Sequence, residues 1–439
     1  MYKSNMTKNA FYSERALRLI PGGAHTYSKG DDQFPLNAPK IIDRGLGSDL
    51  WDVDGNKYID MAMSLGTTIL GHAYEPVLEA VRKELNKGVN FCRPSVIEGE
   101  LAELITSIIP SADMVKFGKN GSDAVTASVK LARAYTRRSY IARCSSDPFN
   151  AIHDWFIGST VIDRGVPEEV KNLTLIFDYN DIESCQKLFD KHPQKIAAFI
   201  LEPISFIEPK NNFLQQLKEL CEKNGALLIF DEVVSGFRFS LAGAQGFANV
   251  TPHLSAFGKA MGNGFSVSAL TGQKEFMKLG GLDHDEERVF LLSTTYGGET
   301  HSIAAAIKTI HEIIDKKAIS HFWQIGKKFI QKFNQLAVQH NIQKLVFAHG
   351  YPCKPAISFN DIGGNPFPAI RTLFIQEMIA HNVLIPYLVP SLAHNDETLS
   401  KVMKAVNNAF KVISDALNNE ELEKKINGYI LKPVFRKFN

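Results

Sequence analysis

The sequence predicts an α/β protein with a large domain, built on a mostly parallel sheet between helices, and a smaller C-terminal α+β domain. Its 439 residues, 44% of them hydrophobic and 22% charged, suffice for more than one domain. Two buried-strand candidates, 196–204 and 226–234, flank the helical segment 211–225, and chain sterics make such a unit a right-handed parallel crossover. Strands and helices alternate from about residue 110 to 300, whereas from about 320 long helices surround a short strand candidate.

In chain order we expect four parts: an N-terminal arm and hairpin (1–60), a large α/β domain (61–318), a small α+β domain (319–418) and a tail (419–439). The hairpin prediction rests on Asp54-Gly55 between apolar flanks. The tail is charged at first and then mixed. This composition leaves open whether it adds a helix and a strand or is a loose end.

Charge and cysteine usage exclude several classes of function. The net charge of +2 points to neither nucleic acid nor an acidic surface as a partner. Five cysteines without CxxC spacing argue against a disulfide framework and against a zinc site, and they fit a reducing cytosol. The N-terminus has no uninterrupted apolar segment, and the sequence contains no run of 18 apolar residues. We therefore expect a cytoplasmic protein that does not enter the membrane.

The strand candidate 226–234 carries two adjacent carboxylates, Asp231 and Glu232. A buried carboxylate is costly unless a cation or a donor meets it. Ligands of parallel α/β sheets lie beyond the carboxyl ends of the strands, where Asp231 and Glu202 of the preceding strand are both expected. A structural ion pair or a helix cap is the alternative, and other segments must decide.

Three further segments point to one cofactor. Asn120, Gly121 and Ser122 open a helix, whose free N–H groups favour a phosphate, although the same turn is typical of an ordinary N-cap. Lys259 lies in an apolar, Gly-rich segment, where desolvation lowers the pKa of a lysine and suits it to Schiff-base chemistry; the alternative is a solvated surface group. Thr295 precedes another helix and is either a phosphate ligand or part of a turn. Together with Asp231, which would meet a protonated pyridine nitrogen, these features match what pyridoxal phosphate (PLP) requires.

Six segments in order carry a resemblance to a known family: YIDMAMSLGTTILGHAYEPV, FGKNGSDAVTASVKLARAYT, ILEPI, LLIFDEVVSGFR, GAQGFANVTPHLSAFGKAMGNG and TTYGGET. The chain resembles the class III, fold-type I PLP-dependent aminotransferases, and most closely their glutamate-1-semialdehyde 2,1-aminomutase-like branch. The resemblance runs from LIPGGAHTY to about residue 415. It implies a fold-type I large domain with a seven-stranded sheet, PLP as the cofactor, and amino transfer from an amino-acid donor to a carbonyl acceptor.

The resemblance also implies roles for individual residues. Lys259 matches the lysine that forms a Schiff base (an aldimine) with the cofactor and then moves protons, and Asp231 matches the partner of the pyridine nitrogen. Val233 and Phe149 match the residues on the two ring faces. The remaining cofactor-binding candidates match the phosphate cradle, a carboxylate near the cofactor and a phosphate ligand donated by the neighbouring subunit: Asn120, Gly121, Ser122, Glu202 and Thr295. A ligand from the neighbour implies a homodimer with shared active sites.

Departures from the family pattern concern the substrate. Lys29 stands where the aminomutase has an arginine for the substrate carboxylate, Pro386 stands for a glutamate, Ile207 replaces an asparagine, and Phe149-Asn150 replaces part of a YHG turn. The GGAHTYSKGDDQFP start resembles aminotransferase-like proteins of bacterial surface-polysaccharide loci, which favours a sugar-derived or small carbonyl acceptor. The substrate-side candidates are His25, Tyr27, Lys29, Ser64, His153 and Glu299, each of which has a hydrogen-bonded structural role as the alternative.

Three other functions compete with this interpretation. An aminomutase of the glutamate-1-semialdehyde type moves the amino group within one molecule. A non-catalytic relative binds PLP without turnover, but the intact Lys259 and Asp231 argue against it. A nucleotide-binding protein lacks support, because the sequence has no GxGxxG or GxxxxGK[ST] to hold a phosphate chain.

Overall fold

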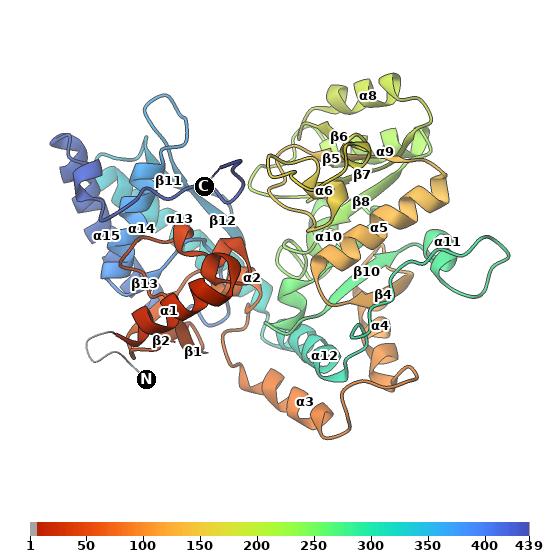
Figure 1. The fold of residues 1–439 in the computed structure, drawn as a ribbon, viewed down its shortest axis with the longest axis horizontal. Helices are drawn as coiled ribbons and strands as arrows, with labels where there is room; N and C mark the ends of the chain where they lie inside the picture. Colours follow the sequence, from red (N-terminus) through yellow and green to blue (C-terminus); the bar gives the residue numbers. More distant parts are fainter. Residues whose placement is uncertain (1–6, 439) are drawn as a thin grey trace. The chain divides into compact units, whose positions relative to one another are not determined.

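The computed structural model describes residues 7–438 and divides into two units (Figure 1). Unit 1 comprises the described parts of 1–65, 69–74 and 320–439, and unit 2 comprises 66–68 and 75–319. The N-terminal arm and the chain from residue 320 onward therefore fold together, although more than two hundred residues separate them in sequence.

Unit 2 is built on a seven-stranded sheet with the order β4-β10-β9-β8-β7-β5-β6. Its strands are β4 (Met114–Gly118), β5 (Tyr140–Cys144), β6 (Thr174–Phe177), β7 (Ile196–Leu201), β8 (Leu227–Asp231), β9 (Leu254–Phe257) and β10 (Ser268–Gly272). Neighbouring strands run parallel except β10, which is antiparallel to both β4 and β9. All residues of β7 and β8 are buried, as continuous apolar strands require. The expected α/β fold with a mostly parallel seven-stranded sheet is confirmed.

Helices accompany the strands of unit 2. They are α3 (Glu75–Leu85), α4 (Val96–Ile108), α5 (Gly121–Thr136), α6 (Asp154–Ile157), α7 (Glu168–Lys171), α8 (Ile182–Lys191), α9 (Phe213–Lys223), α10 (Gly243–Ala248), α11 (Lys274–Met277) and α12 (Thr300–Asp315), with 3-10 turns η4 (Lys259–Gly262) and η5 (Lys278–Gly280). The helix α5 packs on β9 and β10, α9 packs on β8, and α12 packs on α3, α4 and η4. The short α2 (Met63–Gly66) contains the point in the sequence, between residues 65 and 66, at which the chain passes from unit 1 to unit 2.

Unit 1 contains two small sheets. The strands β1 (Ile42–Leu46), β2 (Asp49–Asp52) and β3 (Lys57–Asp60) form an antiparallel meander, to which β13 (Val383–Leu384) adds in parallel. Gly55 has φ +91°, so the turn of the predicted hairpin uses the backbone freedom of glycine. The second sheet pairs β11 (Val346–Tyr351) with β12 (Lys354–Phe359). The helices are α1 (Lys8–Leu19), α13 (Ala318–Gln339), α14 (Pro368–Ala380) and α15 (Asp396–Asn418), with 3-10 turns η1 (Pro21–Gly23), η2 (Tyr27–Lys29), η3 (Asp31–Gln33) and η6 (Glu423–Lys425).

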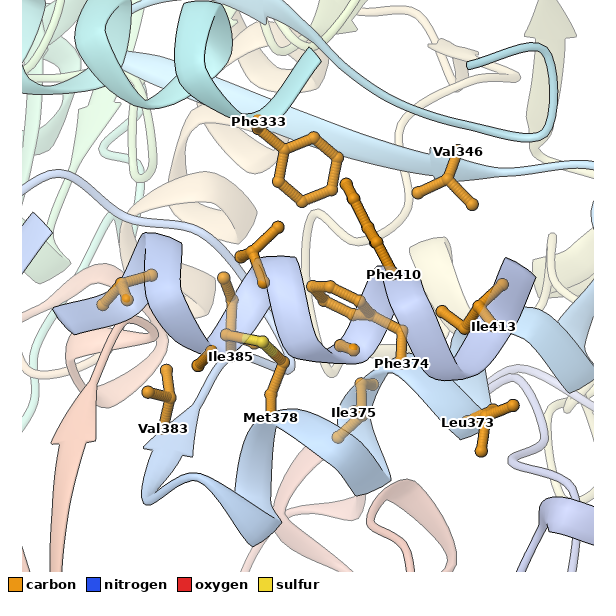
Figure 2. Packing of buried hydrophobic residues seen from close by; sticks show 14 of the residues in the cluster. Phe333, Val346, Leu373, Phe374, Ile375, Met378, Val383, Ile385, Phe410 and Ile413 are labelled. Atoms are coloured by element: carbon orange, nitrogen blue, oxygen red, sulfur yellow. The ribbon is translucent and has the colours of Figure 1, made fainter. Parts of the chain in front are cut away.

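An aromatic cluster joins the helices α13, α14 and α15 of unit 1 (Figure 2). Phe333 of α13 meets Phe410 of α15 at a centroid distance of 4.9 Å and Phe374 of α14 at 5.9 Å, both edge to face. Such pairs stabilise a core beyond the area that they bury. Although α13 and α15 are long, no helix within residues 7–438 has the length and apolarity that a membrane span needs.

The tail after residue 418 is neither an added helix-and-strand nor a loose end. From η6 to residue 438 the chain forms no further helix or strand, and hydrogen bonds join it to the rest of unit 1. The Tyr429 hydroxyl donates to the carbonyl oxygen of Phe34 at 3.0 Å, and the N–H of Leu431 donates to Thr372 Oγ1 at 2.9 Å. The Leu431 side chain is 2% exposed, so the tail contributes to the core.

Candidate active site

The carboxyl ends of three adjacent parallel strands, β5, β7 and β8, bring three carboxyl groups together. Asp231 is the last residue of β8, Glu202 follows β7 directly, and Asp147 lies three residues beyond β5. They are 5%, 8% and 4% exposed, respectively. The N–H of Glu202 donates to Asp147 Oδ2 at 2.8 Å, which joins two of the strand ends directly. The structure thus supports the expected placement of Asp231 and Glu202 and adds Asp147.

The Asp231 carboxylate has two neutral donors. Its Oδ1 accepts a hydrogen bond from the N–H of Val233 at 3.1 Å, and its Oδ2 accepts one from Asn150 Nδ2 at 3.0 Å. Burial is the main cause that raises the pKa of Asp231 to about 6; the hydrogen bonds from Asn150 and Val233 and the charge of Lys259 act against it, and the charge of Glu202 adds to it. A buried carboxylate in this state gains stability from any additional cation or N–H donor.

Two buried oxygen atoms beside Asp231 lack a hydrogen-bond partner within residues 7–438. They are Oδ1 of Asp147 and Oδ1 of Asn150. A buried polar atom without a partner is costly, and most such atoms in folded proteins are satisfied. These two atoms therefore mark the neighbourhood of Asp231 as a place that a polar ligand completes.

Close contacts of the backbone bring Gly121, Val233 and Lys259 to the same region. A Cβ atom at Gly121 would lie 2.6 Å from Val233 Cγ1, and one at Gly258 would lie 3.6 Å from the same atom and 3.7 Å from Gly121 Cα. The start of α5, Val233 and the residue before Lys259 are thus in contact. Lys259 itself has φ +43°, a backbone conformation that a side-chain-bearing residue adopts at a cost and that is common at functional sites.

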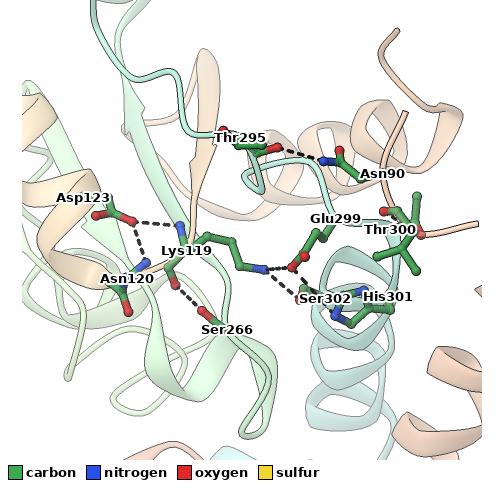
Figure 3. Close-up of polar contacts among 11 residues, drawn as sticks. Asn90, Lys119, Asn120, Asp123, Ser266, Thr295, Glu299, Thr300, His301 and Ser302 are labelled. Carbon is green, nitrogen blue, oxygen red and sulfur yellow. Dashed lines mark hydrogen bonds and ion pairs between the residues drawn. The ribbon is translucent and has the colours of Figure 1, made fainter. Parts of the chain in front are cut away.

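The N-terminus of α5 forms a cradle for an anion (Figure 3). Asp123 Oδ2 accepts hydrogen bonds from the N–H groups of Lys119 at 3.0 Å and Asn120 at 2.8 Å, which fixes the turn before the helix. The N–H groups of Gly121 and Ser122, in the first turn, have no acceptor inside a helix. The Ser122 hydroxyl accepts from the N–H of Ile152 at 3.2 Å and keeps its own proton for donation. Over 16 residues the helix dipole adds to these donors, so the turn fits a phosphate.

An ion pair ties this turn to the start of α12 (Figure 3). Lys119 Nζ lies 2.6 Å from Glu299 Oε2 and donates to Ser302 Oγ at 3.0 Å. Glu299, a predicted substrate residue, therefore already has a cationic partner. Thr295 is exposed, and its carbonyl oxygen accepts from Asn90 Nδ2 at 3.0 Å. Within the described chain no hydrogen bond joins Thr295 to the 120–122 turn.

The other predicted residues lie as follows. The Phe149 side chain is 45% exposed and packs edge to face on Phe156 at a centroid distance of 5.7 Å. His153 Nδ1 lies 2.9 Å from Thr126 Oγ1. The remaining substrate-side candidates belong to unit 1: His25 before η2, Tyr27 and Lys29 in η2, and Ser64 in α2 with φ +53°.

Sequence reasoning did not include Asp147 or Asn150 among the site residues. The signal that could have found Asp147 is the same strand-end rule that identified Asp231 and Glu202, applied to the apolar segment that ends at Cys144. The strand-end rule does not single out Asn150, because only its hydrogen bond to Asp231 in the structure places it at the site.

Comparison with known proteins identifies the family. The family model for class III aminotransferases matches residues 27–410. The chain belongs to this family. It is 31% identical over 425 residues to a 3-aminobutyryl-CoA aminotransferase of Cloacimonas acidaminovorans, covering 94% of this chain and 99% of that protein. It is 32% identical over 418 residues to the glutamate-1-semialdehyde 2,1-aminomutase of Francisella philomiragia, covering 89% and 95%.

Solved structures agree with membership of the class III aminotransferases. The FumI protein of Sphingopyxis sp. MTA144, solved in its PLP internal aldimine form, has a TM-score of 0.85 and 26% identity over 94% of this chain and 98% of that one. An omega-transaminase from Sphaerobacter thermophilus has a TM-score of 0.82 and 25% identity over 93% and 98%. The expected fold-type I architecture is confirmed. The residues present fit PLP, because a buried carboxylate, unsatisfied polar atoms, an anion cradle and a lysine share one region of unit 2.

Proposed function

We propose that this class III aminotransferase uses PLP to move an amino group from an amino-acid donor to a small or sugar-derived carbonyl acceptor, with Lys259 as its catalytic residue. The observation that carries the proposal is that Val233 lies in contact with the turn at Gly121 and with Gly258, the residue before Lys259, and is hydrogen-bonded to Asp231. Gly121 and Ser122 would hold the phosphate, Asp231 the ring nitrogen, and Val233 and Phe149 the two ring faces. Asn120 shapes the phosphate turn, and Glu202 is linked to the neighbourhood of Asp231 through its hydrogen bond to Asp147.

PLP, when bound, supplies an electron sink for the negative charge that develops on a substrate carbon as it loses its proton. The protein's part is to hold and move that proton. Lys259 would hold the cofactor through its Nζ, and the amine freed by an amino substrate would accept the proton from the α-carbon of the donor. The same amine returns a proton to the carbonyl carbon of the acceptor. For this chemistry Asp231 would stay ionised, because its negative charge would keep the ring nitrogen of a bound PLP protonated.

The proposed substrate class rests on the positions at which the sequence departs from the aminomutase pattern. Lys29 in η2 is a cation that can meet a carboxylate or a phosphate but lacks the bidentate geometry of arginine. Pro386 leaves no carboxylate where the aminomutase branch has one. Together with the resemblance of the N-terminal segment to proteins of surface-polysaccharide loci, these residues support a sugar-derived or small carbonyl acceptor over glutamate semialdehyde.

A homodimer with shared active sites belongs to the proposal. Thr295 is exposed and lies on the loop that the Lys119–Glu299 ion pair holds in place. An exposed hydroxyl on a fixed loop is available to the phosphate site of a second subunit. Measurement of molar mass in solution tests the dimer, and Thr295→Val then tests the shared site through weaker PLP binding.

A glutamate-1-semialdehyde-type aminomutase is the second candidate, because relatives of that name share 32% and 39% identity with the chain. The two reactions differ in their need for a donor. A mutase turns over its substrate without any added amino acid, whereas an aminotransferase requires one. A single assay with and without added L-glutamate and other amines therefore separates them.

Lys259→Ala tests the shared chemistry of both candidates. We expect this variant to bind PLP without the visible band of the lysine-bound cofactor and to lose turnover, while its fold is unchanged by circular dichroism. Lys274→Ala, at an exposed lysine of unit 2, is the matched control and should behave as the wild type. Normal turnover of the Lys259 variant refutes the proposal, and a wild-type band that no amino donor alters favours the aminomutase or a missing partner substrate.

A further inference from the structure

Asp147 is a buried acid beside Asp231 that the proposed mechanism does not yet use. It lies in the loop after β5, and its Oδ2 accepts hydrogen bonds from the N–H of Glu202 at 2.8 Å and from Asn150 Nδ2 at 3.4 Å. The same Asn150 Nδ2 donates to Asp231 Oδ2 at 3.0 Å. Two carboxyl groups from different strand ends therefore compete for one amide group, which is itself only 3% exposed.

The charges around Asp147 determine which of the two carboxyl groups receives the stronger hydrogen bond from the Asn150 amide. Glu202 and Asp231 both face it with negative charge, and Cys144 lies close by. Arg143 acts on Asp147 through its positive charge, but its N–H groups are donated to Ser159 and to the carbonyl oxygen of Cys144. Burial, followed by the charge of Glu202, raises the pKa of Asp147 to about 8, so the group is mainly protonated at neutral pH.

The position of the proton follows from the hydrogen bonds. Because Asp147 Oδ2 already accepts from two N–H groups, the proton belongs on Oδ1, which has no partner within residues 7–438. A neutral Asp147 competes weakly for the Asn150 amide, and the shorter of the two amide contacts is indeed the one to Asp231. If Asp147 were ionised, it would attract the amide and add a second negative charge that favours protonation of Asp231.

We propose that Asp147 is a positioning residue that, as a neutral acid, leaves the Asn150 amide to Asp231, so that the Asp231 carboxylate keeps its charge and its orientation toward the ring nitrogen of PLP. Asp147 acts through Asn150 and takes no part in the transfer of the substrate proton. This inference rests on the role proposed above for Asp231.

Four variants test it in the full-length protein: Asp147→Asn, Asp147→Ala, Asp178→Asn and Asp231→Asn. Asp147→Asn keeps the shape and the neutral charge, whereas Asp147→Ala removes the side chain that confines Asn150. Asp178 directly follows β6, the next strand of the sheet, but it is exposed, so it is the matched control. Circular dichroism confirms the fold of each variant, and Asp147→Asn keeps the test valid if the alanine variant does not fold.

The first readout is the infrared difference spectrum of cofactor-free protein, wild type minus Asp147→Asn. We expect the carbonyl band of a protonated carboxyl group at pH 7, lost above the pKa of about 8. The second readout is the dissociation constant of PLP from absorbance titration. Asp147→Asn should bind PLP as the wild type does at pH 7, whereas Asp147→Ala should bind about tenfold more weakly, the effect of about one hydrogen bond to a charged group. In the wild type, but not in Asp147→Asn, affinity should fall as pH rises through 8.

Three results overturn the proposal: no protonated-carboxyl band at pH 7, unchanged PLP affinity in Asp147→Ala, or an Asp147→Asn variant with the wild-type pH dependence. Asp231→Asn separates this failure from that of the proposed function. If Asp231→Asn weakens PLP binding while Asp147→Ala does not, only the role of Asp147 is wrong. If Asp231→Asn binds PLP as tightly as the wild type, the role of Asp231 is wrong as well.

Discussion

Gly121→Ala probes the close contact on which the candidate site is built. The added methyl group would lie 2.6 Å from Val233 Cγ1 and 2.7 Å from Val233 Cγ2, closer than real Cβ atoms approach other carbons. Val233 cannot easily move away, because its β-branched side chain is stiff at χ1 and its N–H is hydrogen-bonded to Asp231 Oδ1 at 3.1 Å. We therefore expect relief of the clash to displace either the start of α5 or the Asp231 carboxylate.

The cost can be bounded with a control in the same unit. Overpacking by one methyl group destabilises a well-packed site by about 1 to 3 kcal/mol. Gly99 lies inside α4, and a Cβ there would meet no atom within 4 Å. Gly99→Ala should therefore stabilise the protein by about 0.5 to 1 kcal/mol through the helix propensity of alanine. The two variants should differ in free energy of unfolding by about 1.5 to 4 kcal/mol.

Urea unfolding of the cofactor-free variants, followed by PLP titration of the folded proteins, measures both consequences. Gly121→Ala should unfold at lower urea and bind PLP more weakly, whereas Gly99→Ala should bind it as the wild type does. Adding Val233→Ala to Gly121→Ala should recover part of the lost stability, since the clash is between these two side chains. Equal stability and equal PLP affinity of the two alanine variants would show that the contact is not tight and that the reasoning is wrong.

Two further predictions concern pH and the tail. Because burial raises the pKa of Asp231 from 3.8 to about 6, the folded state binds an extra proton between these values, and this group lowers stability as pH rises through that window. Cofactor-free Asp231→Asn lacks this loss of stability. Chemical denaturation should therefore find the variant more stable than the wild type at pH 7, by about 3 kcal/mol at most, and equally stable near pH 3. A stability difference that stays constant across the pH range contradicts this prediction. Leu431→Ala, at a side chain 2% exposed, should destabilise unit 1 by about 2 to 4 kcal/mol, whereas Leu19→Ala, at a side chain 64% exposed, should change stability by less than about 0.5 kcal/mol. A tail that contributes no stability would give the two leucine variants the same unfolding midpoint.

Local patterns were sufficient for much of the fold and for the central residues of the site. The apolar segments around 196–204 and 226–234 predicted β7 and β8, and the strand-end rule then placed Asp231 and Glu202 correctly at their carboxyl ends. The 120–122 turn was predicted as a helix start because a small polar turn before an amphipathic segment is a local signal, and α5 begins there. Lys259 stood out through its apolar neighbours alone.

The sequence by itself thus determined which segments become strands and helices, and it singled out the carboxylate and the lysine to which we assign the chemistry. Only the tertiary structure decided their neighbours. Asn150 and Asp231 are 81 positions apart, and the pairing of the tail with the N-terminal arm spans 395 positions between Tyr429 and Phe34. The periodicity of a segment shows which of its side chains are buried but not what they are buried against. The protonation of Asp147 depends on that second property, because it is set by the charges and donors that distant strands bring to one sheet edge.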